Sequence, residues 1–241
     1  MTKYKIAFVK FGGLSAGGTE KWLQIMAANV DRLKFEIDYY YCDAAPYVGS
    51  DYRHSDTDPY RKKYMEDHGV NLIKFHVGAK DITKPHHPWI DTDFWEVFDG
   101  SKYDLVQTAK AGHPEYPYIE MKNKVVEYVT LFGMIDDSPN IVKTIHISHW
   151  SKDAWLRADG NHNQVEVIYI PVEYPCTGDT FRKELEIPDD VIVCGFHQRN
   201  DNNIASYIQL AAIHRIKNPK VHTLVLGGGV PYRKQALQLG M

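Results

Sequence analysis

A short apolar strand, a glycine-rich loop and an amphipathic helix open the chain, and this order limits the available folds. Residues Tyr4–Lys10 are expected to form a buried strand, because they are a short run rich in β-forming residues closed by Gly12 and Gly13. Gly17-Gly18-Thr19 then leads into Glu20–Val30, where apolar residues recur at helical spacing. A strand, glycine loop and helix in this order predict a unit that binds ligands at the helix N-terminus.

Strands and helices alternate through the rest of the first 170 residues. The pattern predicts strands at Phe35–Cys42, Val70–Phe75, Tyr103–Thr108, Val125–Leu131, Val142–Ser148 and Val165–Ile170. It predicts helices at Tyr60–His68, Asp93–Phe98 and Ala154–Ala158, the last capped by Ser151 or Asp153. The proline-containing stretch Gly78–Asp91 predicts irregular structure. The alternation indicates an α/β fold, a Rossmann-like doubly wound parallel sheet with helices on both faces.

The composition changes after Ile170, where prolines and a glycine mark a linker. Beyond it the pattern restarts with a strand at Val191–Phe196, a helix near Ile204–Ile216 and a strand at Val221–Leu226. We therefore predict a first domain over residues 1–170, and a linker with the start of a second Rossmann-like domain over residues 171–241. This second stretch is too short to bury a three-layer core alone, so it is expected to be incomplete, with apolar strand edges that favour association.

Bulk composition excludes several classes of protein. A net charge of −3 and a pI near 6.4 argue against nucleic-acid binding, which requires a basic face. Three scattered cysteines predict neither a disulfide framework nor a zinc cluster, and favour a reducing, cytoplasmic location. The chain opens without a secretory signal pattern, and no apolar run approaches the roughly 20 residues that a membrane helix needs.

Two loops are candidate ligand sites. In the first, Gly17, Gly18 and Thr19 precede a helix whose free N–H groups attract phosphate, although a plain tight turn is the alternative. The loop matches neither the G-x-G-x-x-G fingerprint nor a Walker A loop. In the second, Arg199 follows a strand and could hold a diphosphate, or could lie in a solvated polar loop. Gly228 ends the next strand and is a weaker candidate of the same kind.

The histidines differ in what their positions predict. His113 follows a strand within a loop at the expected carboxyl edge of the sheet, which makes it a candidate catalytic residue or a loop histidine satisfied by backbone. His86 and His87 flank prolines without a third ligand at metal-site spacing, so no metal is expected there. His146 and His149 are interpreted as structural residues.

The order of these pieces resembles a GT-B fold glycosyltransferase of the group-1 (family 4) superfamily, whose members use nucleotide sugars. The resemblance rests on segments that follow one another in the family's order: Lys5–Val9, Gly17–Glu20, Tyr103–Gln107, Ile145–Trp150, Val167–Val172, Arg182–Ile187, Val193–Arg199 and Leu224–Gly229. It implies sugar transfer from a nucleoside-diphosphate sugar to a glycan, lipid or small-molecule acceptor. Neither a metal nor another cofactor is expected, and the resemblance leaves room for peripheral membrane contact.

The resemblance also assigns residues and reveals departures. Gly17 and Gly18 match the family's loop near the reacting phosphate and sugar, and Arg199 matches the arginine that holds the diphosphate. The family's lysine about five residues after that arginine is absent, and Leu131-Phe132-Gly133 stands where the family has a histidine. The family's paired-glutamate motif should lie beyond Met241, so the chain looks truncated and is expected to turn over slowly or not at all.

Other classes of function stay open at this point. A non-catalytic nucleotide- or glycan-binding domain would fit an incomplete second domain. A sugar-nucleotide epimerase is another member of the same fold. A nicotinamide-binding protein is disfavoured, because Asp43 follows the second strand but the glycine spacing is wrong. The sequence does not determine the donor sugar, the acceptor or the oligomeric state, whereas the resemblance implies transfer with retention of the anomeric configuration.

Overall fold

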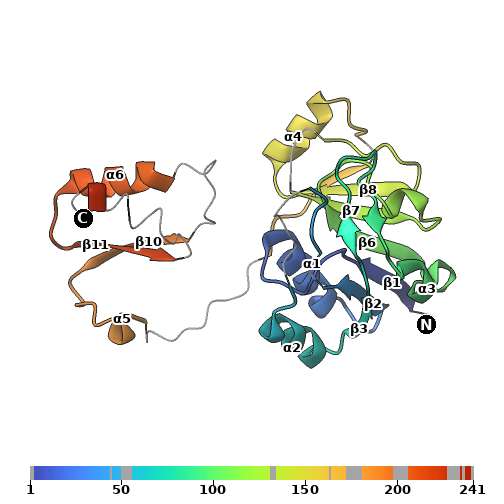
Figure 1. The fold of residues 1–241 in the computed structure, drawn as a ribbon, viewed down its shortest axis with the longest axis horizontal. Coiled ribbons are helices and arrows are strands. Elements are labelled where there is room, and N and C mark those ends of the chain that lie inside the picture. The colour runs from blue at the N-terminus through green and yellow to red at the C-terminus, as the bar shows by residue number, and fades with distance from the viewer. Residues whose placement is uncertain are drawn as a thin grey trace. The chain divides into compact units, whose positions relative to one another are not determined.

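The computed structural model describes residues 3–43, 45–49, 56–130, 134–162, 164–171, 181–197, 206–226, 234 and 237–239. The chain divides into two compact units, Met1–Val172 and Glu173–Met241 (Figure 1). Each unit has its own strands and helices, and each is described separately.

A seven-stranded parallel sheet forms the centre of the first unit, in the order β3-β2-β1-β6-β7-β8-β9 (Figure 1). Its strands are β1 (Tyr4–Val9), β2 (Phe35–Cys42), β3 (Asn71–Phe75), β6 (Leu105–Lys110), β7 (Val125–Val129), β8 (Ile141–His146) and β9 (Val165–Val167). The predicted parallel, Rossmann-like sheet is confirmed. The strand expected at Tyr103–Thr108 starts and ends two residues later, so Lys110 belongs to it.

Short helices follow the strands and lie on both sides of the sheet. They are α1 (Gly18–Asn29), α2 (Pro59–Asp67), α3 (Phe94–Val97) and α4 (His149–Arg157), with 3₁₀ turns η1 (Gly100–Lys102) and η2 (Tyr118–Glu120). Helix α2 begins after Asp58, whose side chain accepts a hydrogen bond from the Tyr60 N–H, as an N-cap does. It ends before Gly69, whose φ of +67° suits a glycine at a helix C-terminus.

Helix α4 begins five residues earlier than predicted. Its N-cap is Ser148, whose Oγ accepts a hydrogen bond of 3.2 Å from the Ser151 N–H. Ser151 therefore lies inside the helix, and neither it nor Asp153 is the cap. The prediction failed because a serine three residues upstream satisfies the same orphan N–H group.

The stretch Gly78–Asp91 also differs from its prediction, because it contains a short antiparallel pair. Strands β4 (Ala79–Lys80) and β5 (Trp89–Ile90) pair with each other. The Gly78 N–H donates to the Ile90 carbonyl, and the Asp81 N–H donates to the Pro88 carbonyl, both at 2.9 Å. Pro88 contributes only its carbonyl, so its missing N–H costs no ladder bond.

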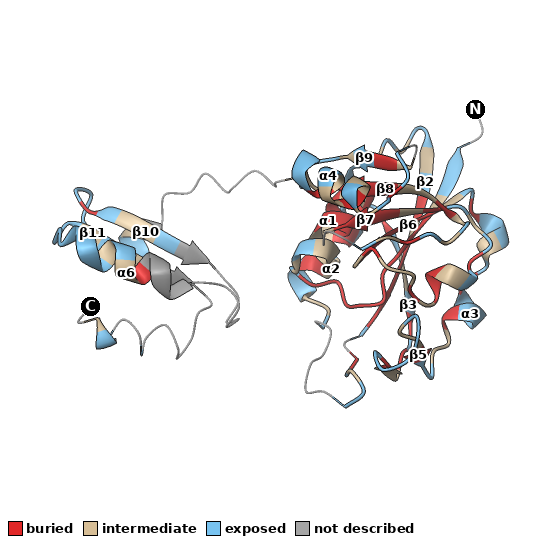
Figure 2. Cartoon of the chain, turned by 90° about the horizontal axis from the view of Figure 1, so that it is seen from above, coloured by how far each residue is buried: buried red, intermediate tan, exposed pale blue. Residues whose placement is uncertain are grey.

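Both faces of the sheet are buried, as residues of the central strands show (Figure 2). Along β1, Ala7 and Val9 belong to one apolar cluster and Phe8 belongs to the other, because successive strand residues point to opposite faces. The face toward α1 is closed by Trp22, whose ring stacks on Tyr128 at 3.5 Å between centroids. This two-sided burial explains why the strands read as continuous apolar runs.

The second unit contains α5 (Phe181–Glu184), β10 (Ile192–His197), α6 (Ser206–Ile216) and β11 (Val221–Leu226). The two strands pair in parallel over six residues, so the predicted restart of a strand–helix–strand pattern is confirmed. Leu210 of α6 is buried. Across the described residues of both units, no helix combines the length and apolar character that crossing a membrane requires.

Candidate functional site

The carboxyl edge of the large sheet brings two of the predicted site segments together. Strand β1 ends just before the loop that enters α1, and the neighbouring strand β6 ends just before the loop that carries His113. Lys10, the residue directly after β1, donates a hydrogen bond of 2.7 Å from Nζ to the Ala109 carbonyl of β6. Because carboxyl ends of parallel strands share one edge, this is the edge where open α/β sheets bind ligands.

Gly18 leaves the N-terminus of α1 open. It is exposed, and a Cβ atom at this position would meet nothing within 4 Å. Within the described part of the chain, no group accepts a hydrogen bond from the Gly18 or Thr19 N–H. Gly17 occupies the N-cap and offers no side chain to these donors. The first turn of α1 therefore presents free N–H groups and the positive end of the helix dipole.

Gly17 also makes room for a side chain of the protein itself. A Cβ atom at Gly17 would lie 2.7 Å from Glu20 Oε2, so the missing side chain makes room for the protein's own carboxylate. Thr19 Oγ1 donates to the same carboxylate oxygen at 2.8 Å, and Lys10 Nζ lies 3.5 Å from Glu20 Oε1. Glu20 and Lys10 thus form a largely buried ion pair beside the helix N-terminus.

A buried lysine at the end of β6 supports the His113 loop. Lys110 Nζ lies 2.5 Å from both Glu127 Oε2 and Asp136 Oδ2, and donates to the His113 carbonyl at 2.8 Å. Thr144 Oγ1 donates to the second oxygen of Glu127. Burial opposes the charge of Lys110, but the two carboxylates prevail and raise its pKa. The raised pKa favours the charged ammonium, which holds the His113 carbonyl in place, whereas burial raises the pKa of Glu127.

His113 is half-buried and contacts a second histidine. Its Nε2 lies 3.1 Å from His87 Nδ1, while its Nδ1 is buried without a hydrogen-bond partner in the described residues. Burial is the main cause that lowers the pKa of His113; Glu115 acts in the opposite direction, and His87, Lys110 and Lys80 reinforce the decrease. The imidazole is consequently neutral near pH 7, the form in which a histidine can accept a proton.

Of the remaining predicted residues, the structure describes only the other histidines. Arg199 and Gly228 lie outside the described residues, as does the segment Leu131-Phe132-Gly133. His146 is fully buried against the ring of Trp155, whereas His149 is exposed, so the two histidines do not form a pair. Among the described residues, no group of three His, Cys, Asp or Glu side chains could hold a metal ion.

Sequence reasoning missed the carboxylates and lysines of this edge. The predicted strand Tyr103–Thr108 ends before Lys110, and the acidic residues that pair with Lys110 come from β7 and from the loop after it. His87 was considered only as a metal ligand. A signal did exist for Lys10 and Lys110, since a lysine directly at the end of a buried strand is unusual and has to find a partner.

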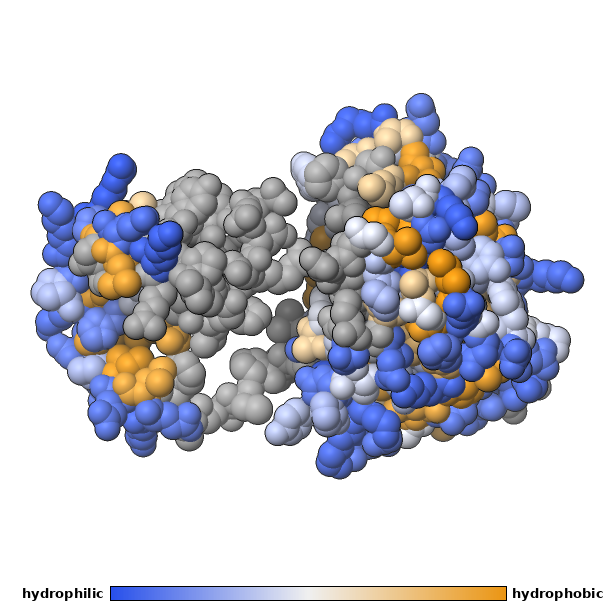
Figure 3. All heavy atoms as spheres, in the orientation of Figure 1, coloured by the Kyte–Doolittle hydropathy of each residue, from blue (hydrophilic) through white to orange (hydrophobic). Residues whose placement is uncertain are grey.

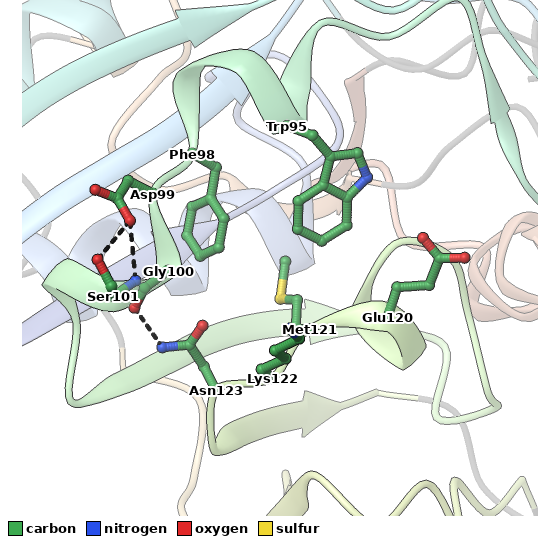
Figure 4. Close-up of a pocket in the computed structure, with 9 residues that line it drawn as sticks. All are labelled: Trp95, Phe98, Asp99, Gly100, Ser101, Glu120, Met121, Lys122 and Asn123. Atoms are coloured by element: carbon green, nitrogen blue, oxygen red, sulfur yellow. Dashed lines mark hydrogen bonds between the residues drawn. The ribbon is translucent and has the colours of Figure 1, made fainter.

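A pocket of the first unit lies at the other edge of the sheet. A pocket of about 480 Å³ is lined by Trp95, Phe98, Asp99, Gly100, Ser101, Glu120, Met121, Lys122 and Asn123 (Figure 4). These residues precede β6 and β7, so the pocket opens at the amino edge of the sheet. Asp99 and Asn123 already bond the backbone of η1. Asp99 and Asn123 therefore stabilise this local turn.

The surface itself does not single out a site. On the face of the first unit seen in Figure 3, hydrophilic side chains predominate and several hydrophobic groups are scattered among them. Isolated exposed apolar side chains of this kind are normal for a folded protein. The features that distinguish a site are thus the carboxyl edge of the sheet and its polar contacts.

Comparison with known proteins places the fold in a class. No protein-family model and no curated protein matches the chain. HepE from Anabaena, solved with UDP-glucose, matches with a TM-score of 0.64 and 16% identity over 98% of this chain and 66% of its own. Sucrose-phosphate synthase from Thermosynechococcus elongatus matches with a TM-score of 0.59 and 14% identity over 99% and 66%. The chain thus spans 66% of the length of these proteins.

These matches define the class of fold. The chain has the Rossmann-like α/β fold of the GT-B glycosyltransferases. A further HepE structure, solved with UDP and glucose, matches at 17% identity with a TM-score of 0.62. At identities this low, the likeness establishes the architecture, and residue roles have to be argued from the site.

Proposed function

We propose that this chain belongs to a glycosyltransferase that moves a sugar from a nucleoside-diphosphate sugar to an acceptor. The observation that carries the proposal is the open N-terminus of α1 at Gly18, on the carboxyl edge that also holds His113. Free N–H groups at a helix N-terminus are suited to a phosphate. The structures of similar fold that were solved with UDP and UDP-glucose support a donor of this chemical class.

The chemistry assigns separate roles to the residues of the edge. The acceptor oxygen forms a bond to the anomeric carbon while the bond from that carbon to the diphosphate oxygen breaks. Charge then develops on the departing diphosphate, and the free N–H groups of Gly18 and Thr19 would stabilise it, while the Gly17 N–H donates to Ser15 Oγ. His113 would take the proton that leaves the acceptor hydroxyl, because its imidazole is neutral near pH 7.

The finer assignments belong to the same proposal. We assign Arg199 and Gly228 of the second unit to the diphosphate, residues 1–170 to the acceptor side, and residues 171–241 to the donor side. The donor sugar is a hexose and the acceptor a glycan, a lipid or a small molecule, in the cytoplasm or at a membrane surface. No metal is assigned a role, so a chelator should leave donor binding unchanged.

Replacing Gly18 tests the phosphate site. A Cβ atom there meets nothing within 4 Å, so an alanine adds one methyl group in open space, whereas the branched side chain of a valine would add bulk beside the free N–H groups. Because hydrogen bonds to charged groups contribute about 1.5–3 kcal/mol, Gly18→Val should weaken UDP binding by roughly tenfold to a hundredfold. Calorimetric titration with UDP measures this, with Gly18→Ala as the matched control. Equal affinity for UDP in wild type and Gly18→Val would remove the helix N-terminus from the site.

Replacing Arg199 tests the donor side of the proposal. Arg199→Ala should weaken binding of nucleoside diphosphates by roughly tenfold to a hundredfold, for the same energetic reason. Arg199→Lys should recover only part of the affinity, since a lysine cannot form the bidentate fork of a guanidinium. Thermal-shift titrations with several nucleoside diphosphates compare the variants. Nucleotide binding without any donor turnover in the full-length protein would instead favour a non-catalytic binding domain.

A further inference from the structure

Two histidines that are 26 residues apart in the sequence face each other at the carboxyl edge of the sheet. His113 Nε2 lies 3.1 Å from His87 Nδ1, and the ring centroids are 4.8 Å apart with the ring planes at 64°. Both side chains are half-buried. The distance is that of a hydrogen bond between two imidazole nitrogens.

The backbones on both sides of this contact are held in place. The Tyr116 N–H donates to the His86 carbonyl at 2.8 Å, which joins the two loops directly. A buried ion pair between Lys80 and Glu115 joins them a second time. The His113 carbonyl accepts from Lys110 Nζ, as described above. These backbone and ion-pair contacts hold the two loops together, so the fold itself brings the two rings into contact.

His87 lies in a tight turn with an uncommon backbone conformation. Its φ is +48°, in the left-handed region that residues with a Cβ atom seldom occupy. The turn that produces this conformation is closed by a hydrogen bond of 3.2 Å from the His87 N–H to the Lys84 carbonyl. Sparsely populated conformations of this kind cluster at functional sites.

The contact permits only one proton between the two rings. One nitrogen has to donate an N–H and the other has to accept it with a lone pair, so two imidazolium ions cannot share this geometry. The charged groups around His113 are Glu115 from its own loop, Lys110 from β6 and Lys80 from β4. The two lysines oppose a charge on His113 and Glu115 favours one, while burial opposes it most.

We propose that His87 and His113 form a dyad that holds one shared proton, in which His87 is the positioning residue that sets the tautomer and charge of His113. The catalytic meaning of the dyad rests on the proposed function. During transfer, the acceptor oxygen bonds to the anomeric carbon, the diphosphate leaves, and the proton of the acceptor hydroxyl binds Nδ1 of His113, the ring nitrogen that has no partner among the described residues. The Nε2–H of His113 donates to His87 Nδ1 before and after this step, so the hydrogen bond stabilises the imidazolium that forms.

The dyad can be tested without any sugar donor. Ring ¹⁵N and ¹H signals of the histidines are followed by NMR against pH in the full chain and in two variants, His87→Gln and His86→Gln. His86 is the matched control, because it is adjacent, exposed and also has a positive φ of 60°. Glutamine keeps the polarity of the side chain and does not titrate.

Coupled imidazoles take up protons in two steps that belong to the pair. In wild type, the signals of both rings should therefore move in both steps, with the midpoints at least about one pH unit apart. In His87→Gln, His113 should titrate in a single step. The midpoint of that step should lie at a higher pH than the midpoint of the more acidic of the two wild-type steps. His86→Gln should retain both steps. A single step for His113 with the same midpoint in wild type and in His87→Gln would overturn the dyad.

A reciprocal variant covers the case in which His87→Gln does not fold. His113→Gln should change the titration of His87 by the same amount, since coupling between two protonation sites is mutual. An unchanged titration of His87 would overturn the proposal. If the wild-type chain does not bind UDP, the proposed function is contradicted while the dyad is unaffected. Failure of the proposed function can therefore be told apart from failure of the dyad.

Discussion

Gly17 and Glu20 share one small volume at the start of α1: a Cβ atom on Gly17 would lie 2.7 Å from Glu20 Oε2. The glycine allows the carboxylate to fold back over the helix N-terminus, where Thr19 Oγ1 and Lys10 contact it. A free ligand phosphate at the same N-terminus would therefore approach beside a carboxylate that Lys10 already neutralises. The loop thus holds an ion pair of its own beside the N–H groups that are proposed to bind a ligand.

The first prediction concerns this relationship. Gly17→Ala should displace the Glu20 side chain and lower the free energy of unfolding by about 1 kcal/mol, because the hydrogen bond and the ion pair of Glu20 are disturbed. Its φ of −60° and ψ of 153° suit alanine, so backbone strain does not contribute. Urea unfolding measures the change.

A double-mutant cycle with Glu20→Ala isolates the contact. When Glu20 is already alanine, Gly17→Ala should cost almost nothing. An identical cost in both backgrounds would show that Gly17 acts through some other neighbour.

The second prediction concerns Lys110, which lies between Glu127 and Asp136 in the interior. Lys110→Met should lower the free energy of unfolding by about 3–5 kcal/mol, because two buried carboxylates lose their counter-ion. Adding Glu127→Gln and Asp136→Asn to this variant should restore a large part of the loss. Chemical unfolding of wild type, Lys110→Met and the triple variant measures the free energy of unfolding of each.

An exposed lysine provides the matched control. Lys63 pairs with Asp67 on the surface of α2, where water screens the charges, so Lys63→Met should leave the unfolding midpoint nearly unchanged. If Lys110→Met were as mild as Lys63→Met, the buried network would contribute little to stability.

The third prediction concerns acid stability and His146. Neither ring nitrogen of this fully buried residue has a hydrogen-bond partner in the described residues, and burial, with a smaller effect of Lys152, lowers its pKa to about 4. In the unfolded chain its pKa returns to about 6.5, so the unfolded state binds more protons between these values. Stability from this group is complete above pH 6.5 and falls by about 2–3 kcal/mol as the pH approaches 4.

His146→Leu should remove this contribution. The free energy of unfolding, measured by urea titration at several pH values, should then depend less steeply on pH between 6.5 and 4. His149→Leu is the control, because His149 is exposed on the neighbouring helix and the variant should keep the wild-type slope. The same slope in His146→Leu as in wild type would mean that other groups cause the acid destabilisation.

Much of the fold could be predicted because it depends on local pattern. The strand at Phe35–Cys42 and the strand at Val221–Leu226 have the predicted bounds, since short apolar runs between glycines or polar turns signal buried strands. The parallel order follows from strands that alternate with helices. The first residue of α4 is harder to predict, because two nearby serines and an aspartate can each cap a helix.

The sequence by itself determined the two-part α/β organisation, the glycine loop before α1 and the place of His113 after a strand. Only the tertiary structure decided that His113 meets His87, that Lys110 is paired on two sides, and that His146 is buried while His149 is exposed. The physical reason is that periodicity and turn chemistry act between residues close in the chain. Which loops and side chains meet at a sheet edge depends instead on the spatial order of the strands, and here β6 lies between β1 and β7.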